Sequence, residues 1–383
     1  MVRLLHTSDW QIGKLFGQFE ADDAAVLADA RFQVVERLAG IATERRVDAV
    51  LVAGDVFDAQ TVSDRTIHRL FNALGGFPGP WIMIPGNHDA ALSESVWTRA
   101  QRLGAIPEQV RLCLSAQPMV LPEHGLAVLP APLTQRQTHT DLTEWFAQAS
   151  TPPGLVRVGM AHGSVQGILA EDIDSPNPIA PGRAAQAGLD YLALGDWHGC
   201  RQIDGRTWYS GTPETDRFRG SASGYALYVE IEGPGASPAV MQLPTGAYRW
   251  RSETLTLRVP SDIGLAVQCL AGFESRDVVQ LSITGEADLD GYRRLTQAIT
   301  QARGVTRALL GDLAGLALRP TLQDIESLRA DGYVGDVIDT LRAQQDGPDG
   351  EVARDALAVL AGILDRRAHP SPSPSELFAG ETD

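Results

Sequence analysis

The sequence predicts an α/β fold for the N-terminal part of the chain, followed by a small α+β unit and a helical C-terminal segment. Up to about residue 90, short apolar runs alternate with helical patterns, which is typical of βαβ units with parallel strands. From about residue 252, strand and helix patterns follow one another in the rhythm of a separate small unit. We expect domains at 1–250 and 251–320, a helical segment at 321–368 and a disordered tail at 369–383.

Composition and length limit the possible classes of protein. A chain of 383 residues with 44% hydrophobic side chains can form two or three domains with real cores. No apolar stretch approaches the roughly 20 residues of a membrane span, so we expect a cytoplasmic protein without membrane contact. The three cysteines, Cys113, Cys200 and Cys269, lack paired spacing, which argues against a disulfide framework or a structural zinc site. The net charge of −16 counts against a free-standing DNA binder.

The elements of the first domain follow from periodicity and turn residues. The opening part is predicted as strand 3–8, helix 22–45, strand 49–52, helix 63–74 and strand 81–85. Residues 110–135 contain short apolar pieces separated by prolines, and we expect an antiparallel meander there. A helix at 141–149 and strands that begin near Leu155, Tyr191, Arg206 and Tyr225 complete the domain.

The second unit and the tail continue in the same way. We expect strand 253–259, helix 261–271, strand 277–283, helix 288–303 and two short strands within 305–318. Thr321 would cap a helix with Leu322, Ile325 and Leu328, and further helices are expected around residues 334–341 and at 351–367. Such short helices need burial, either on the chain's own small domain or on a partner's helix, and both alternatives stay open.

Five short polar motifs follow apolar strands of the first domain. They are Asp9-Trp10-Gln11, Gly54-Asp55, Gly86-Asn87-His88-Asp89, His162-Gly163 and Gly195-Asp196-Trp197-His198. A single Gly-Asp or His-Gly pair is ordinarily a turn, but five such motifs in order at strand ends are hard to produce by turn chemistry alone. Ligands of open α/β sheets bind beyond the carboxyl ends of the strands, so at least the first three motifs should converge.

The residue types in these motifs suit a pair of divalent cations. Carboxylates and an amide oxygen are ligands for Mn²⁺ or Mg²⁺, and imidazole suits Mn, Fe and Zn. Asp55 could bridge both ions. Two ions about 3.5 to 4 Å apart can clamp a phosphoryl group and activate water. The predicted reaction is therefore hydrolysis of a phosphate ester.

The five motifs, together with Gly54–Asp58 and Tyr209–Glu214, resemble the signature of the calcineurin-like metallophosphoesterases, most of all their DNA-repair exonuclease branch. The resemblance covers residues 1 to about 230. It implies a β-sandwich flanked by helices, with a small cap domain and a helical C-terminal tail. It also implies an SbcD-type nuclease subunit that acts on DNA, works with an SMC-like (SbcC-type) ATPase and forms a homodimer.

The resemblance also suggests roles for individual residues. It assigns Asp9, Asp55 and His198 to one metal, and Asp55, Asn87, His162 and Asp196 to the other. His88 would be the catalytic acid that protonates the leaving oxygen, and Asp89 would hold the turn or orient His88. Two divalent ions are expected, with Mn²⁺ favoured and Mg²⁺ as the alternative.

Two residues depart from the family pattern. Gln11 stands where the family has a metal-binding histidine, and Asp196 stands where it has the first histidine of Gly-His-x-His. Gln11 could still offer an oxygen ligand, although a weaker one, while Asp196 adds a negative charge. The expected consequence is a site shifted toward Mn²⁺ or Mg²⁺ with a weaker first metal, or a site that has lost its activity.

Other residues leave further alternatives. Arg217 and Arg219 could contact a phosphate backbone or belong to a solvated loop, and Trp10 and Trp197 are expected to pack rather than stack on bases. The remaining histidines match no motif and are expected on the surface or in the core: His6, His68, His124, His139 and His369. Besides the exonuclease, the sequence permits a small-molecule phosphodiesterase or phosphatase, or a non-catalytic scaffold.

Overall fold

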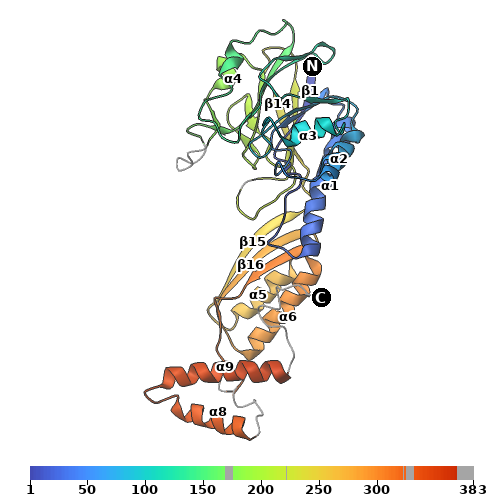
Figure 1. The fold of residues 1–383 in the computed structure, drawn as a ribbon. Helices are drawn as coiled ribbons and strands as arrows, with labels where there is room; N and C mark the ends of the chain where they lie inside the picture. Colours follow the sequence, from blue (N-terminus) through green and yellow to red (C-terminus); the bar gives the residue numbers. More distant parts are fainter. Residues whose placement is uncertain (169–175, 221, 322, 325–331, 369–383) are drawn as a thin grey trace. The chain divides into compact units, whose positions relative to one another are not determined.

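The structure is a computed structural model that describes residues 1–168, 176–220, 222–321, 323–324 and 332–368 (Figure 1). The chain divides into two compact units, Met1–Ala247 and Tyr248–Asp383. The predicted disordered tail at 369–383 and most of the predicted helix after Thr321 lie outside the described residues. Among the described helices, none is both long and apolar enough to cross a membrane.

The first unit contains two six-stranded sheets. The first sheet has the order β14 (Ala239–Pro244), β13 (Tyr225–Ile231), β1 (Val2–Thr7), β2 (Ala49–Ala53), β3 (Trp81–Ile84) and β4 (Val110–Leu112). The second has the order β11 (Arg201–Gln202), β12 (Thr207–Tyr209), β10 (Tyr191–Gly195), β7 (Val156–His162), β6 (Leu126–Ala131) and β5 (Met119–Leu121). Strands β1, β2 and β3 are parallel, as the βαβαβ pattern predicts.

The two sheets face each other across an apolar core, and helices cover their outer faces (Figure 1). Strand β2 is apolar throughout because both of its faces are covered. Leu51 points into the core between the sheets, while Val50 and Val52 point to the helices. The covering helices of the first sheet are α1 (Ala21–Glu44), α2 (Asp64–Ala73) and α3 (Val96–Arg102). Helix α4 (Arg183–Gln186) and a 3₁₀ turn at Glu144–Ala147 contribute to the apolar cluster on the second sheet. The predicted α/β class with a sandwich is confirmed.

The meander predicted at 110–135 is wrong. Strand β4 joins the first sheet in parallel with β3, whereas β5 and β6 form an antiparallel pair in the second sheet. The proline-containing segment after β4 therefore carries the chain from one sheet to the other, and apolar periodicity does not reveal which sheet a strand joins. The helix predicted at 141–149 is only the 3₁₀ turn.

The second unit is built around a parallel sheet. Its strands are β15 (Arg249–Leu257), β16 (Asp277–Ala287), β17 (Ala308–Asp312) and β18 (Leu316–Leu318), with β16 in the centre. Helices α5 (Asp262–Ala271) and α6 (Leu289–Val305) connect the strands and close the apolar core. Helices α8 (Tyr333–Gln344) and α9 (Gly350–Ala368) pack on each other around Ile338 and Leu357.

His6 connects the two sheets of the first unit. Its ring is fully buried on β1, with Nδ1 2.9 Å from the Tyr191 hydroxyl and Nε2 3.2 Å from the Leu194 carbonyl oxygen on β10. Burial lowers the pKa of His6 from 6.5 to about 3, although the contact with the Leu194 carbonyl acts in the opposite direction. The ring is therefore neutral in the folded protein at ordinary pH.

The buried neutral His6 should make stability depend on pH. The unfolded chain binds a proton near pH 6.5, whereas the folded chain does so only near pH 3, so stability falls as the pH drops below 6.5. The slope is about 1.4 kcal/mol per pH unit. Between pH 7 and pH 5, the free energy of unfolding of the wild type should therefore fall by about 2 kcal/mol more than that of His6→Gln. Urea unfolding at the two pH values measures this difference. The exposed His68→Gln should behave like wild type; equal losses in all three proteins would contradict the expectation.

Candidate metal centre

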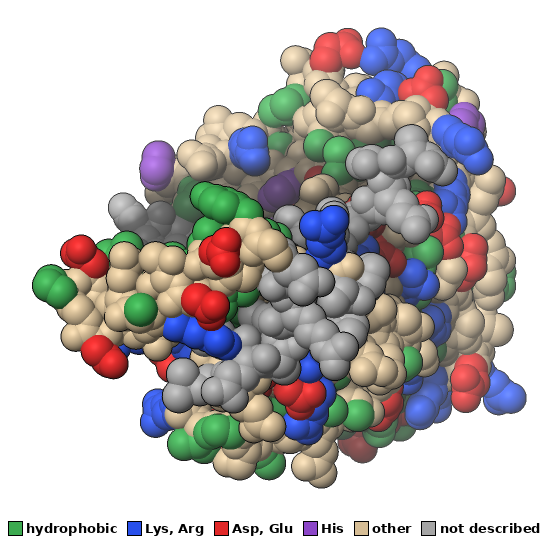
Figure 2. Space-filling view, turned by 90° about the horizontal axis from the view of Figure 1, so that it is seen from below, with side chains coloured by type: hydrophobic (Ala, Val, Ile, Leu, Met, Phe, Trp, Pro, Cys, Tyr) green, Lys and Arg blue, Asp and Glu red, His purple; other side chains and the backbone are tan. Residues whose placement is uncertain are grey.

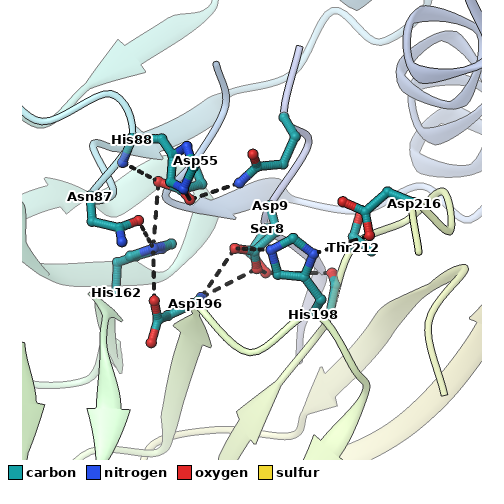
Figure 3. A network of polar contacts seen from close by, with 12 residues as sticks. Ser8, Asp9, Asp55, Asn87, His88, His162, Asp196, His198, Thr212 and Asp216 are labelled. Atoms are coloured by element: carbon teal, nitrogen blue, oxygen red, sulfur yellow. Dashed lines mark hydrogen bonds and ion pairs between the residues drawn. The ribbon is translucent and has the colours of Figure 1, made fainter. Parts of the chain in front are cut away.

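The predicted site residues meet where strands of both sheets end (Figure 3). Asp9, Asp55 and Asn87 follow β1, β2 and β3 of the first sheet, while His162 ends β7 and Asp196 follows β10 of the second. Ligand atoms of Asp9, Asp55 and His162 all lie within 4.8 Å of one another. The structure thus brings together motifs that are far apart in the sequence.

The imidazole of His162 shows most clearly that these residues can hold a cation. Its Nδ1 donates to the Ala53 carbonyl at 2.8 Å, so Nε2 carries a lone pair when the ring is neutral. Nε2 lies 3.3 Å from Asn87 Oδ1, 3.5 Å from Asp55 Oδ1 and 3.7 Å from Asp196 Oδ1 (Figure 3). Four atoms with lone pairs would repel one another unless a cation or a proton lies among them, and this donor set fits a divalent metal ion.

Without a metal, a proton takes the place of that cation. Burial alone would lower the pKa of His162, but the charges of Asp55, Asp9 and Asp196 outweigh it and raise the pKa to about 9. Burial also raises the pKa of Asp196, and the charge of Asp9 acts in the same direction although His162 opposes it. The metal-free site is therefore expected to hold a protonated His162 at neutral pH.

A second group of donors surrounds Asp9. His198 Nε2 lies 3.9 Å from Asp9 Oδ1, and the Ser8 hydroxyl donates to Asp9 Oδ2 at 2.5 Å. The backbone N–H of Asp196 also donates to the Asp9 carboxylate, at 3.2 Å. Gln11 donates from its amide nitrogen to Asp55 Oδ2 at 2.8 Å. These contacts hold the carboxylates in place, and the predicted oxygen ligand from Gln11 remains a prediction.

His88 lies at the more open side of the site. Its backbone N–H donates to Asp55 Oδ1 at 2.9 Å, and its ring Nδ1 lies 2.7 Å from the Asp58 carbonyl oxygen. Nε2 is 4.0 Å from Asp55 Oδ2, and about a third of the side chain (34%) is exposed. This arrangement leaves Nε2 able to meet a substrate.

Asp89 joins two of the loops that carry predicted ligands. Its buried carboxylate accepts N–H groups of Val56 at 2.9 Å, Phe57 at 3.1 Å and Gly86 at 2.6 Å. Burial and the neighbouring charge of Asp55 raise the pKa of Asp89, although the N–H donors act in the opposite direction. These contacts agree with a residue that holds the turn rather than one that orients His88.

The backbone at the site adopts conformations that non-glycine residues rarely use. Asp9, Gln11, Asp55 and Asp196 have φ values of 54°, 50°, 53° and 99°. Such left-handed conformations cost free energy and are found preferentially at functional sites. Gly86 permits the close approach of two loops, since a Cβ there would lie 2.2 Å from Asp55 Oδ1. Sequence periodicity carries no signal for these backbone angles.

Sequence reasoning missed several residues beneath the site. Arg31 on α1 is buried and donates to the carbonyls of Asp9 at 3.1 Å and Trp10 at 2.6 Å, and to Thr212 Oγ1 at 3.0 Å. It thereby connects the first ligand loop to the loop after β12. The only available signal was an arginine on a face of the helix pattern that is otherwise apolar.

The remaining predicted residues are two arginines and two tryptophans. Arg217 Nη2 lies 2.5 Å from His198 Nδ1, whereas Arg219 is exposed. Trp10 is buried edge-on against Trp81, with ring centroids 5.9 Å apart, so it packs as expected. Trp197 is half-buried and lies beneath the guanidinium of Arg201.

Metal binding at this site should release a proton. Because His162 has a pKa of about 9 in the metal-free chain, a cation must displace its proton at lower pH, and affinity should fall roughly tenfold per pH unit below 9. Calorimetric titration with Mn²⁺ at pH 7.5 in buffers of different ionisation enthalpy should show about one proton released. His162→Gln should abolish the release; an affinity independent of pH between 6.5 and 8 would contradict this account.

Comparisons with known proteins place the chain in a family. The sequence profile of the calcineurin-like phosphoesterases matches residues 2–218. The SbcD protein of the SbcCD nuclease of Rhodobacter capsulatus is 31% identical over 295 residues, which cover 63% of this chain and 69% of that protein. The crystal structure of TT1561 of Thermus thermophilus has a TM-score of 0.40 and 12% identity, covering 63% of this chain and 98% of that chain. The chain belongs to the calcineurin-like phosphoesterase family.

Proposed function

We propose that this protein is a phosphodiester hydrolase that uses two divalent metal ions, and that it acts on DNA as an exonuclease subunit. The observation that carries the proposal is the position of His162 Nε2 among the oxygens of Asn87, Asp55 and Asp196. The second ion would be held by Asp9, Asp55 and His198, with Gln11 beside them. The similarity to a nuclease subunit supports DNA as the substrate. Mn²⁺ is the favoured ion, with Mg²⁺ as the alternative.

The proposed hydrolysis needs both the bound ions and His88 as an acid. When bound, the ions would activate water and neutralise charge on the phosphate. The hydrogen bond from Nδ1 to the Asp58 carbonyl fixes the His88 ring, and a protonated Nε2 would donate to the leaving 3′ oxygen. The N–H of His88 on Asp55 Oδ1 keeps this acid next to a carboxylate that both ions would share.

The charge of the chain favours a second candidate function. The net charge is −16, and Lys and Arg side chains are interspersed with Asp and Glu on the face shown in Figure 2. A DNA-binding surface usually has a concentration of basic residues. A small-molecule phosphodiesterase or phosphatase would not need one. Gln11 and Asp196 also keep open a scaffold that binds a partner without catalysis.

An assay of two substrates separates these functions. With Mn²⁺, the protein should cleave linear DNA, and His88→Ala should reduce the rate by about 10² to 10⁴ because the leaving oxygen loses its proton donor. The exposed His139→Ala is the matched control and should keep full activity. Cleavage of a chromogenic diester without cleavage of DNA would favour the small-molecule enzyme. Absence of turnover with Mn²⁺ or Mg²⁺ would contradict both enzymes.

The proposed partner is an SMC-like ATPase, and helix α9 offers a surface for it. One side of α9 packs within the second unit, where Ala353, Leu357 and Ala361 are almost fully buried. Val352, Val359 and Ile363 lie on the other side, with exposed fractions of 69%, 63% and 49%. The predicted apolar stripe of this helix is therefore divided between the chain's own core and solvent. Dimerisation of the chain remains a prediction from the family resemblance.

Charges on the exposed side of α9 should prevent this partner from binding. The double variant Val352→Asp/Val359→Asp would require the partner to bury carboxylates, so affinity should fall at least tenfold. The measurement is a titration of the purified chain with the SMC-like ATPase of the same organism. Leu265→Asp on α5, equally exposed at 65%, should bind like wild type. Unchanged affinity of the double variant would eliminate α9 as the docking helix.

A further inference from the structure

A chain of charged side chains leads from the first ligand loop to His198. Lys14 Nζ donates to Asp216 Oδ2 at 2.6 Å. Asp216 Oδ1 in turn lies 3.3 Å from His198 Nδ1, and Figure 3 shows these two side chains next to each other. The Asp216 side chain is almost fully buried, with 1% exposed, and Lys14 is 24% exposed. Lys14 is also the single lysine of the whole chain. Neither residue belongs to the predicted ligand set.

We propose that Asp216 is a positioning residue that fixes His198 for metal binding, and that Lys14 holds Asp216 in place. This inference rests on the proposed function. A histidine binds a metal through one ring nitrogen, and a carboxylate that accepts the N–H of the other nitrogen fixes the tautomer and the ring direction. With Nδ1–H on Asp216, the lone pair of His198 Nε2 is free on the side of Asp9, whose Oδ1 is 3.9 Å away.

Arg217 competes for the same ring nitrogen. Its Nη2 lies 2.5 Å from His198 Nδ1, and its Nε lies 3.2 Å from Asp216 Oδ1. Nδ1 cannot accept from Arg217 and donate to Asp216 at the same time. We assign the donation to Asp216, because its carboxylate is buried and fixed, whereas the Arg217 side chain is 49% exposed and can move. Its Nε can still donate to Asp216.

The position of Lys14 explains why this carboxylate stays in place. Lys14 follows the first ligand loop closely, and its backbone N–H donates to the Gln11 carbonyl at 3.1 Å. Its ammonium group therefore ties the loop of Asp9 to the loop that carries Asp216. Arg31 donates to Thr212 in the same loop as Asp216. Lys14 and Arg31 thus both connect the loop of Asp9 to the loop that carries Thr212 and Asp216.

Titration with Mn²⁺, followed by the electron paramagnetic resonance signal of the free ion, tests the proposal without an activity assay. Wild type should bind two ions. Asp216→Asn should weaken one of them about 10 to 100-fold and leave the ion at His162 unchanged. Lys14→Met should weaken the same ion by less, and Lys14→Arg should restore it. Asp141→Asn is the matched control, since that carboxylate bonds Thr143, Ala180 and Arg183 instead.

The outcomes separate this proposal from the proposed function. Wild type that binds no Mn²⁺ would overturn the proposed function itself. If folded Asp216→Asn binds both Mn²⁺ ions as tightly as wild type, or if its affinity for both ions falls equally, only the proposed role of Asp216 is overturned. If Asp216→Asn does not fold, Lys14→Met decides, and unchanged affinity for both ions would then overturn the proposal. A double variant with His198→Ala should show no further loss from Asp216→Asn if Asp216 acts through His198.

The single lysine allows a second measurement. Lysine labelled with ¹³C at Cε should give one side-chain resonance from the whole protein, from Lys14. Binding of Mn²⁺ should broaden this signal, and Asp216→Asn should shift it in the metal-free protein. A sharp signal at saturating Mn²⁺ would contradict the proposed position of Lys14 beside the metal site.

Discussion

The first unit is organised around an electrostatic requirement at Asp55. The carboxylates of Asp9, Asp55 and Asp196, the amide oxygen of Asn87 and the lone pair of His162 face one another over distances of less than 4 Å in several pairs. Positive charge among these groups stabilises the arrangement, because lone pairs at such distances repel one another. In the metal-free chain a proton on His162 meets part of this requirement. Divalent ions would meet it in full.

The surrounding structure holds this arrangement against its own repulsion. Asp89 ties the loops of Asp55 and Asn87 through three N–H groups, and Arg31 ties the loop of Asp9 to that of Thr212. Left-handed backbone at Asp9 and Asp55 adds a local cost. The apolar strands β1, β2 and β3 offset that cost, since they place the loops at the edge of a large buried core. The geometry of the site is thus maintained by buried hydrogen bonds together with packing of the core.

Much of the fold and of the site could be predicted from the sequence, and the failures have physical causes. Strands β2 and β13 were predicted closely because apolar runs between turn residues are local signals. The pairing of β4 with β3 was not predicted, because strand pairing depends on contacts between residues that are distant in the sequence. The five motifs met as expected. Asp216 escaped notice because an acid in a polar loop has no pattern that distinguishes a buried group from a solvated one.

The candidate centre draws on both sheets, and this has a consequence for how the chain acquires its native state. Asp9, Asp55 and Asn87 come from one sheet, and His162, Asp196 and His198 come from the other. If the ions bind as proposed, they connect the two sheets through their ligands. A chain in which only one sheet has formed would lack half of these ligands and could not retain the ions. Metal occupancy would then report complete assembly of the first unit and would favour all-or-none unfolding.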